Sequence, residues 1–136
     1  EVSPEVIDVH NILNASIMAM HYALDHLTVR PELILVDGNK FHPYQSIPHE
    51  CIVKGDAKLL SIACASILAK NYRDRLMIAL HKEFPEYGWS TNMGYATKQH
   101  QEALNRFGPT IYHRKSFRLD YSSCEKQSCT GNVEKI

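Results

Sequence analysis

Apolar residues recur with helical spacing near the start of the chain. Ser3 and Pro4 are typical of a helix start, because serine caps the first turn and proline is tolerated there. The apolar positions of residues 12–27 then repeat at intervals of three and four, which predicts a helix with one buried face. Polar residues interrupt the pattern, so we expect this helix to break near Asn11 or Asn14.

The pattern then changes from helix to strand and back to helix. Residues 33–37 and 50–54 are short apolar runs, typical of buried strands, and they flank a loop that contains two prolines. Helical spacing returns at about residues 59–83 and again at about 97–107. The core stripe that we expect for the longer helix is Ala65, Leu68, Tyr72, Leu76 and Leu80. This order of elements predicts an α/β layer domain, although two strands make a small sheet.

Composition fits one globular domain. The 136 residues are 44% hydrophobic and 22% charged, and no apolar run approaches the roughly 18 residues of a membrane span. The formal net charge of zero argues against a protein that holds nucleic acid by bulk charge alone. Charge is uneven, however: residues 1–37 are acidic and residues 88–118 are basic. The basic segment predicts either a surface that faces a polyanion or an ordinary solvated face.

The four cysteines do not form a zinc-binding pattern. Cys51 and Cys64 lie in apolar stretches, where a free cysteine behaves as a small hydrophobic residue. Cys124 and Cys129 lie five positions apart in a polar tail. We expect reduced cysteines and a cytoplasmic protein, and a disulfide in the tail stays open as an alternative.

An aspartate follows each predicted strand. Asp37 ends one apolar run, and Asp56 follows the other within Lys-Gly-Asp. Carboxylates at the ends of strands stand at the edge of a sheet, where α/β proteins place their active sites. Taken singly, Asp37 is equally typical of a tight turn and Asp56 of a helix N-cap. Together they indicate a site for Mg²⁺ or Mn²⁺, which prefer oxygen ligands.

The helix after Asp56 carries polar residues on one face. Ser66, Lys70 and Arg73 are four and then three positions apart, which places them on the same side of the helix. A Lys/Arg face binds phosphate, so with the carboxylates it indicates metal-dependent phosphodiester chemistry. The alternative is a solvated helix face on which Asp74 pairs with Lys70 or Arg73.

Tyr95 lies in a glycine-containing loop just before the last predicted helix. An aromatic ring there could stack on a sugar or a base, or it could be partly buried and anchor the loop. The stretch that contains Arg114 is basic, and by itself it is typical of a solvated strand.

These segments resemble the ribonuclease HII family, also called type 2 ribonuclease H. The resemblance covers roughly residues 1–119 in the family's order, and six blocks in order are far more specific than any one of them. The matching blocks are Asn11-Ile-Leu13, Leu35-Val-Asp-Gly-Asn39, Ile52-Val-Lys-Gly-Asp56, Ala65-Ser-Ile-Leu-Ala-Lys70 with Arg73-Asp74, Gly94-Tyr-Ala-Thr-Lys98, and His113-Arg114 with Ser116-Phe117.

The resemblance implies a ribonuclease H-like mixed sheet flanked by helices. It also implies an endoribonuclease that hydrolyses the RNA strand of RNA–DNA hybrids and cleaves at single ribonucleotides in DNA, with Mn²⁺ or Mg²⁺ as cofactor. Asp37 and Asp56 would be catalytic and metal-binding, and Tyr95 would sense the ribonucleotide–deoxyribonucleotide junction. Lys70, Arg73 and Arg114 would face the substrate phosphates, and Ser66 would be a further substrate-binding residue. A full-length member is expected to be a monomer.

One part of the family pattern is absent. The family begins with a strand that carries an adjacent Asp-Glu pair followed by Gly-Arg-Gly, and this sequence contains no such segment. We therefore expect residues 1–119 to be a partial domain, the C-terminal two-thirds of a family member, with a polar tail at 120–136. Two metal-binding carboxylates would be missing, so we expect this chain alone to be inactive.

Two other functions are compatible with some of the same residues. A nucleic-acid-binding module without catalysis would use the basic face of residues 94–118, and its binding would depend neither on metal nor on Asp37. An aspartate-nucleophile phosphatase built on Asp37 is less favoured, because that chemistry usually needs a second aspartate two positions later, where Asn39 stands.

Overall fold

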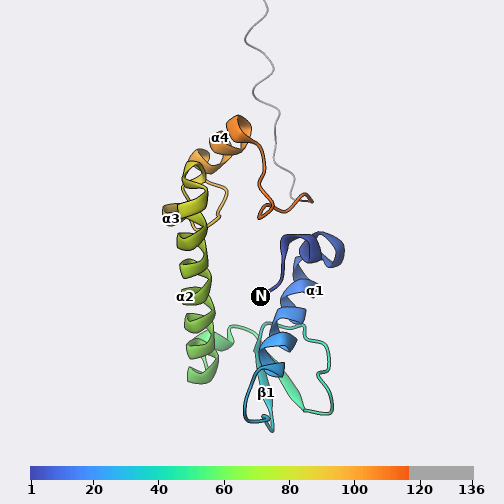
Figure 1. Ribbon diagram of the computed structural model, residues 1–136. Helices are drawn as coiled ribbons and strands as arrows, with labels where there is room; N and C mark the ends of the chain where they lie inside the picture. Colours follow the sequence, from blue (N-terminus) through green and yellow to red (C-terminus); the bar gives the residue numbers. More distant parts are fainter. Residues whose placement is uncertain (117–136) are drawn as a thin grey trace, which may run out of the picture.

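A computed structural model describes residues 1–116 of the chain. Two long helices dominate it, with a small sheet near the start of the second and two shorter helices near its end (Figure 1). The elements in chain order are α1 (Pro4–Asp25), β1 (Ile34–Asp37), β2 (His49–Ile52), the 3-10 turn η1 (Gly55–Ala57), α2 (Leu60–Glu83), the 3-10 turn η2 (Pro85–Tyr87), α3 (Trp89–Asn92) and α4 (Lys98–Phe107).

Helix α1 is interrupted at Asn11, as the sequence predicts. Asn11 has a left-handed backbone (φ 65°), which asparagine tolerates better than most residues. Its side-chain Oδ1 accepts hydrogen bonds from the backbone amides of Leu13 (3.0 Å) and Asn14 (3.1 Å). Asn11 thus serves as the N-cap of the second part of α1.

Strands β1 and β2 are parallel neighbours. Ile34 pairs with His49, and Asp37 pairs with Ile52, so the carboxyl ends of both strands lie at the same edge. Beneath the sheet, one turn of α1 and the loop between the strands close a small apolar core. Its buried residues are Ile17, Ile34, Val36, Phe41, Tyr44 and Ile47. The α/β class with a parallel sheet flanked by helices is therefore confirmed.

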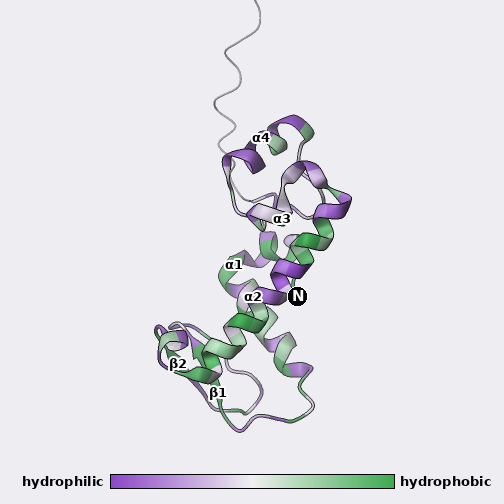
Figure 2. Cartoon of the chain, turned by 90° about the vertical axis from the view of Figure 1, so that its left-hand side faces the viewer, coloured by the Kyte–Doolittle hydropathy of each residue, from purple (hydrophilic) through white to green (hydrophobic). Residues whose placement is uncertain are grey.

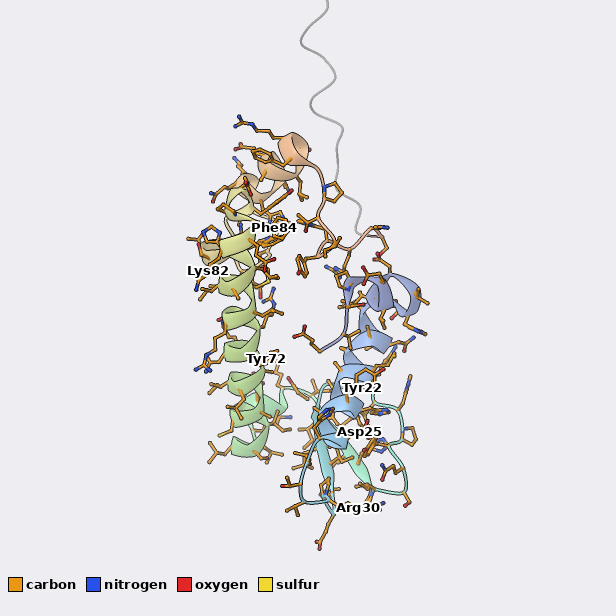
Figure 3. All side chains as sticks on the ribbon, in the orientation of Figure 1. Tyr22, Asp25, Arg30, Tyr72, Lys82 and Phe84 are labelled. Carbon is orange, nitrogen blue, oxygen red and sulfur yellow. The ribbon has the colours of Figure 1, made fainter. Side chains whose placement is uncertain are left out.

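A second core forms where α2 ends. Leu80 of α2 packs with Trp89 of α3 and with Ala103 and Leu104 of α4, and Tyr87 of η2 completes the cluster. Phe84, labelled at the end of α2 in Figure 3, covers its edge and contacts the rings of Tyr87 and Trp89. Thr97 caps α4 by accepting a hydrogen bond from the amide of His100 (3.3 Å). The segment between the two helices predicted at about 59–83 and 97–107 contains the short helix α3.

The predicted core stripe of α2 is wrong for its middle turns. Leu76 and Leu80 lie in or against the second core, but Leu68 is 70% exposed and Tyr72 62% exposed, and Ala65 is exposed as well. Figure 2 shows apolar residues on several turns of α2, and among residues 1–116 no element buries those turns. Helical spacing predicted the helix itself, but it did not identify which of its apolar residues are buried.

The second strand begins and ends earlier than the pattern predicts. It covers His49–Ile52 rather than residues 50–54, because Lys54 turns into a left-handed conformation (φ 56°) and the 3-10 turn η1 follows at once. The stretch around Arg114, which alone resembled a strand, is formed by turns up to residue 116. The predicted tail at 120–136, with Cys124 and Cys129, lies outside the described residues.

Candidate active site at the carboxyl ends of the strands

Asp37 reaches from the end of β1 to the turn that follows β2. Its Oδ1 accepts a hydrogen bond from the backbone amide of Gly55 at 2.8 Å. The following residue, Gly38, takes φ +109°, which glycine adopts without strain, so the chain leaves the strand there. The carboxylate of Asp37 therefore links two segments 18 residues apart instead of only closing a local turn.

Asp56 lies inside the turn η1 and does not cap α2. Its Oδ1 accepts a hydrogen bond from the amide of Ala57 at 2.9 Å, whereas the N-cap of α2 is Leu59. The interpretation of Asp56 as an N-cap is therefore wrong. Both aspartates are exposed, and Gly55, which is bonded to Asp37 and adjacent to Asp56, brings them to the same edge.

Gly55 allows the close approach that this junction needs. A Cβ atom at Gly55 would lie 2.7 Å from Cδ1 of Ile62 and 3.5 Å from Oδ1 of Asp37. Gly55 and Ile62 are both buried, so the first turn of α2 packs directly on the turn η1. The start of α2 therefore holds the two aspartates in place.

The donor set suits a hard cation only in part. Among residues 1–116, no group of three or more His, Cys, Asp and Glu side chains could hold a metal ion. Asp37 and Asp56 each have one oxygen engaged by a backbone amide. Mg²⁺ is commonly bound by one or two carboxylates together with substrate phosphate oxygens, and such a set matches this pair.

The polar face of α2 consists of exposed residues with different partners. Nζ of Lys70 forms an ion pair with Oδ2 of Asp74 at 2.6 Å, as one alternative predicted. Arg73 instead donates from Nη2 to the carbonyl oxygen of Met93 at 2.7 Å. Ser66 is exposed one turn before Lys70. The predicted phosphate-facing residues of α2 therefore share a face but not a common contact.

Tyr95 presents its ring to solvent beside α2. The side chain is 64% exposed, so the prediction of a partly buried anchor is wrong. The guanidinium carbon of Arg73 lies 4.7 Å from the centre of the ring, within the range of a cation–π contact. An exposed aromatic ring with one supported face is suited to stacking on a base or a sugar.

A pair of histidines joins α4 to the segment that follows it. Nε2 of His100 and Nε2 of His113 are 3.1 Å apart, and Nδ1 of His113 accepts the amide proton of Thr110 at 2.9 Å. Burial, and then the neighbouring His100, lower the pKa of His113 to about 4, and burial also lowers the pKa of His100. Both rings are therefore neutral near pH 7. Sequence spacing gave no signal for this pair.

A carboxylate at the start of α1 holds the segment that carries Arg114. Asp8 accepts hydrogen bonds from the amides of Lys115 (2.7 Å) and Ser116 (3.1 Å) and from Oγ of Ser116 (2.5 Å). These bonds, led by that of the Ser116 hydroxyl, lower the pKa of Asp8, and the charge of Arg114 contributes. Arg114 therefore lies near α1. No local pattern predicts a contact across more than a hundred residues.

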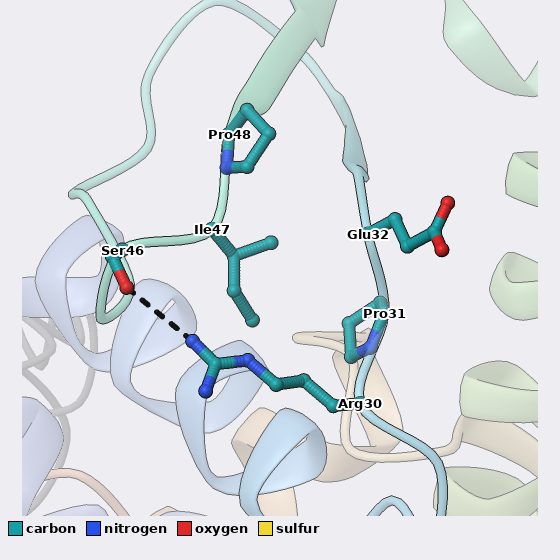
Figure 4. A pocket seen from close by; sticks show the side chains of 6 residues that line it. All are labelled: Arg30, Pro31, Glu32, Ser46, Ile47 and Pro48. Atoms are coloured by element: carbon teal, nitrogen blue, oxygen red, sulfur yellow. Dashed lines mark hydrogen bonds between the residues drawn. The ribbon is translucent and has the colours of Figure 1, made fainter.

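A hollow at the opposite edge of the sheet is separate from the aspartates. It lies where the chain enters β1 and β2, whereas Asp37 and Asp56 lie where the strands end. Nη2 of Arg30 donates to Oγ of Ser46 at 3.4 Å across it (Figure 4). The residues that line this hollow are Arg30, Pro31, Glu32, Ser46, Ile47 and Pro48.

The fold and the site define an α/β domain with two carboxylates at the carboxyl edge of a parallel sheet and a basic helix beside them. The family model for ribonuclease HII matches residues 2–124. The chain belongs to the ribonuclease HII family. In the described part, no helix combines the length and apolar character that a membrane crossing requires.

Curated relatives agree with this assignment. The chain is 62% identical over 113 residues to the ribonuclease HII of Christiangramia forsetii, a match that covers 83% of this chain and 57% of the relative. It is 58% identical over 118 residues to that of Phocaeicola vulgatus, covering 87% and 59%. It is 51% identical over 119 residues to that of Pelodictyon phaeoclathratiforme, covering 88% and 58%. The chain thus spans just under three fifths of these relatives.

Proposed function

We propose that this chain contributes the active-site edge of a metal-dependent endoribonuclease. The enzyme hydrolyses the RNA strand of RNA–DNA hybrids and cleaves at single ribonucleotides embedded in DNA. The observation that carries this proposal is the junction of Asp37 and Asp56 at Gly55, found in a chain of the ribonuclease HII family. Because the chain spans under three fifths of its relatives, the activity is proposed for the whole protein.

Asp37 and Asp56 hold Mn²⁺ or Mg²⁺ in this proposal. Their exposed position supports it, because substrate phosphate oxygens can then complete the coordination that two carboxylates leave open. The bound ion would supply Lewis-acid activation of a water molecule and neutralise charge on the leaving oxygen. The amides of Gly55 and Ala57 keep each carboxylate oriented by binding one of its oxygens.

Cationic and aromatic side chains bind the nucleic acid. Lys70 is 70% exposed and keeps ammonium protons beyond the one that Asp74 accepts, so it can also face a phosphate. We assign Ser66 and Arg114 to the same role, which is contact with the sugar-phosphate backbone of the nucleic acid. Tyr95 stacks at the junction between ribonucleotide and deoxyribonucleotide, because its ring is exposed and carries one open face.

A reducing compartment fits the described cysteines. Cys51 is half-buried, Cys64 is exposed, and both are free thiols. Exposed free thiols persist where thioredoxin and glutathione keep them reduced, so we place the enzyme in the cytoplasm.

Cleavage of a duplex with one ribonucleotide tests the proposal. The chain is mixed with the part of the Christiangramia forsetii relative that lies outside the match, with and without Mn²⁺. We expect metal-dependent cleavage that falls at least about 100-fold in Asp37→Asn and in Asp56→Asn, because an electrostatic partner of the reacting phosphate is lost. Glu50→Gln, an exposed carboxylate on β2, is the matched control and should retain activity.

Two results would contradict the proposal. Near-normal cleavage by Asp37→Asn would remove this carboxylate from the reaction. Binding of the duplex without cleavage, unaffected by metal or by Asp37→Asn, would instead indicate a non-catalytic module that uses the basic residues of 94–118.

A further inference from the structure

Arg73 connects the middle of α2 to the loop that carries Tyr95. Its Nη2 donates to the carbonyl oxygen of Met93 at 2.7 Å, and its guanidinium carbon lies 4.7 Å from the centre of the Tyr95 ring. One side chain therefore binds the loop backbone and supports the ring two residues later. The planar guanidinium, which carries five donors in a rigid arrangement, is well suited to make both contacts at once.

The loop has a conformation that needs support. Met93 (φ 48°) and Gly94 (φ 78°) are both left-handed, which is unfavourable for a residue with a Cβ atom such as Met93. The carbonyl that Arg73 binds belongs to that residue. A Cβ at Gly94 would also lie 3.1 Å from Cε of Met77 on α2, so the methionine side chain would have to shift slightly.

A second clamp holds the loop from the other side. Asn92 is 7% exposed, its Nδ2 donates to the carbonyl of Tyr87 at 2.7 Å, and its Oδ1 accepts from the amide of Gly94 at 2.9 Å. Asn92 thus ties the loop to the aromatic core, while Arg73 ties it to α2. Together, Arg73 and Asn92 fix the backbone that precedes Tyr95, and one face of the tyrosine ring stays open.

We infer that Arg73 is a positioning residue for Tyr95 and does not bind a substrate phosphate. It fixes the backbone before the tyrosine and covers one face of the ring, so that the other face is presented to a base or a sugar. Only the identity of that ligand rests on the proposed function. The packing of Arg73, the loop and Tyr95 is a property of the chain without nucleic acid.

A readout without nucleic acid tests the packing. In the chain labelled with 3-fluorotyrosine, the ¹⁹F signal of Tyr95 is assigned by its loss in Tyr95→Phe. Arg73→Ala and Arg73→Lys should both shift this signal, because neither residue can bind Met93 and cover the ring together. Arg75→Ala, which removes the same charge two residues along α2, should leave it in place. An unchanged Tyr95 signal in both Arg73 variants would overturn the inference.

Binding of a labelled RNA–DNA hybrid separates positioning from phosphate contact. Arg73→Ala should weaken binding about as much as Tyr95→Ala, and the double variant should bind no more weakly than Tyr95→Ala alone. The slope of log K against log salt should stay that of the unmodified chain. If the slope falls by about 0.9 in Arg73→Ala, and the affinity losses of Arg73→Ala and Tyr95→Ala multiply in the double variant, Arg73 contacts a phosphate. That result would overturn the inference.

The two assays keep the inference and the proposed function apart. If the chain mixed with the remaining part of the Christiangramia forsetii relative does not bind the hybrid but the ¹⁹F signal shifts as expected, the proposed ligand is wrong and the positioning role stands. If the hybrid binds and the ¹⁹F signal does not shift, the positioning role is wrong and the ligand stands.

Discussion

Gly55 offers the sharpest test of how the two aspartates are held. Replacing it with alanine would place a Cβ 2.7 Å from Cδ1 of Ile62, well inside the 3.5–4.0 Å at which carbon atoms attract each other. Ile62 is 7% exposed, so its terminal methyl has little free space. Gly55 does not have a left-handed backbone, so the cost of Gly55→Ala in the folded state is steric. The substitution also restricts the unfolded chain, and that effect is the same in the unmodified and in the Ile62→Val background.

The expected cost follows from the clash and from the group that must move. Overpacking a core typically costs about 1–3 kcal/mol. A clash with the end of a flexible side chain falls in the lower part of that range, so we expect Gly55→Ala to cost about 1–2 kcal/mol. Ile62→Val removes Cδ1 itself and costs about 0.5–1.5 kcal/mol alone. In the Ile62→Val background, Gly55→Ala should cost almost nothing, which corresponds to a coupling energy of about 1–2 kcal/mol.

Urea unfolding followed by circular dichroism measures this coupling. The double-mutant cycle compares the unmodified chain, the two single variants and the double variant. Their urea midpoints are compared on the condition that the unfolding free energy depends on urea with the same slope in all four. A double variant destabilised by the sum of the single effects would show that Gly55 and Ile62 are not coupled. In that case the first turn of α2 would not pack on η1 at Ile62, and the support proposed for Asp37 and Asp56 would be wrong.

Two further predictions concern the elements around the Tyr95 loop. Because the pKa of His113 is lowered to about 4, folding favours its neutral ring, and this stabilisation is complete above about pH 6.5 and lost as the pH falls toward 4. His113→Gln should remove most of that acid sensitivity in unfolding curves between pH 4 and 7.5, and an unchanged pH profile would contradict the assignment. Asn92→Ala removes two hydrogen bonds of a buried amide and should lower stability by about 1–3 kcal/mol in urea, whereas a loss below about 0.3 kcal/mol would show that the loop does not depend on it.

Local chemistry was enough to predict several boundaries of the fold. The break of α1 at Asn11 follows from an asparagine that can adopt φ 65° and cap the next turn with its own side chain. The helix predicted at about 97–107 is α4 (Lys98–Phe107), which the hydroxyl of Thr97 caps and which ends before Gly108. In each case the determining interaction spans four residues or fewer, and a sequence pattern can represent it.

Contacts between distant segments could not be predicted in the same way. Two such contacts are the hydrogen bond between His100 and His113 and the one from Ser116 to Asp8. Both depend on how the chain segments pack in three dimensions, which residue spacing does not indicate. The exposed Leu68 shows the same limit, because a helical repeat defines a face without defining its partner. For Asp37 and Asp56 the sequence indicated that both lie at the carboxyl ends of the strands. The hydrogen bond from the Gly55 amide to Asp37 was visible only in the structure.

Paramagnetic broadening by Mn²⁺ measures metal binding by Asp37 and Asp56 directly. In ¹H–¹⁵N spectra of the chain, the amides of Gly55 and Ala57 should broaden first, because each donates to one of the two carboxylates. Asp37→Asn should abolish this broadening at the same Mn²⁺ concentration. Broadening that begins elsewhere, or that persists in Asp37→Asn, would contradict metal binding by these two aspartates.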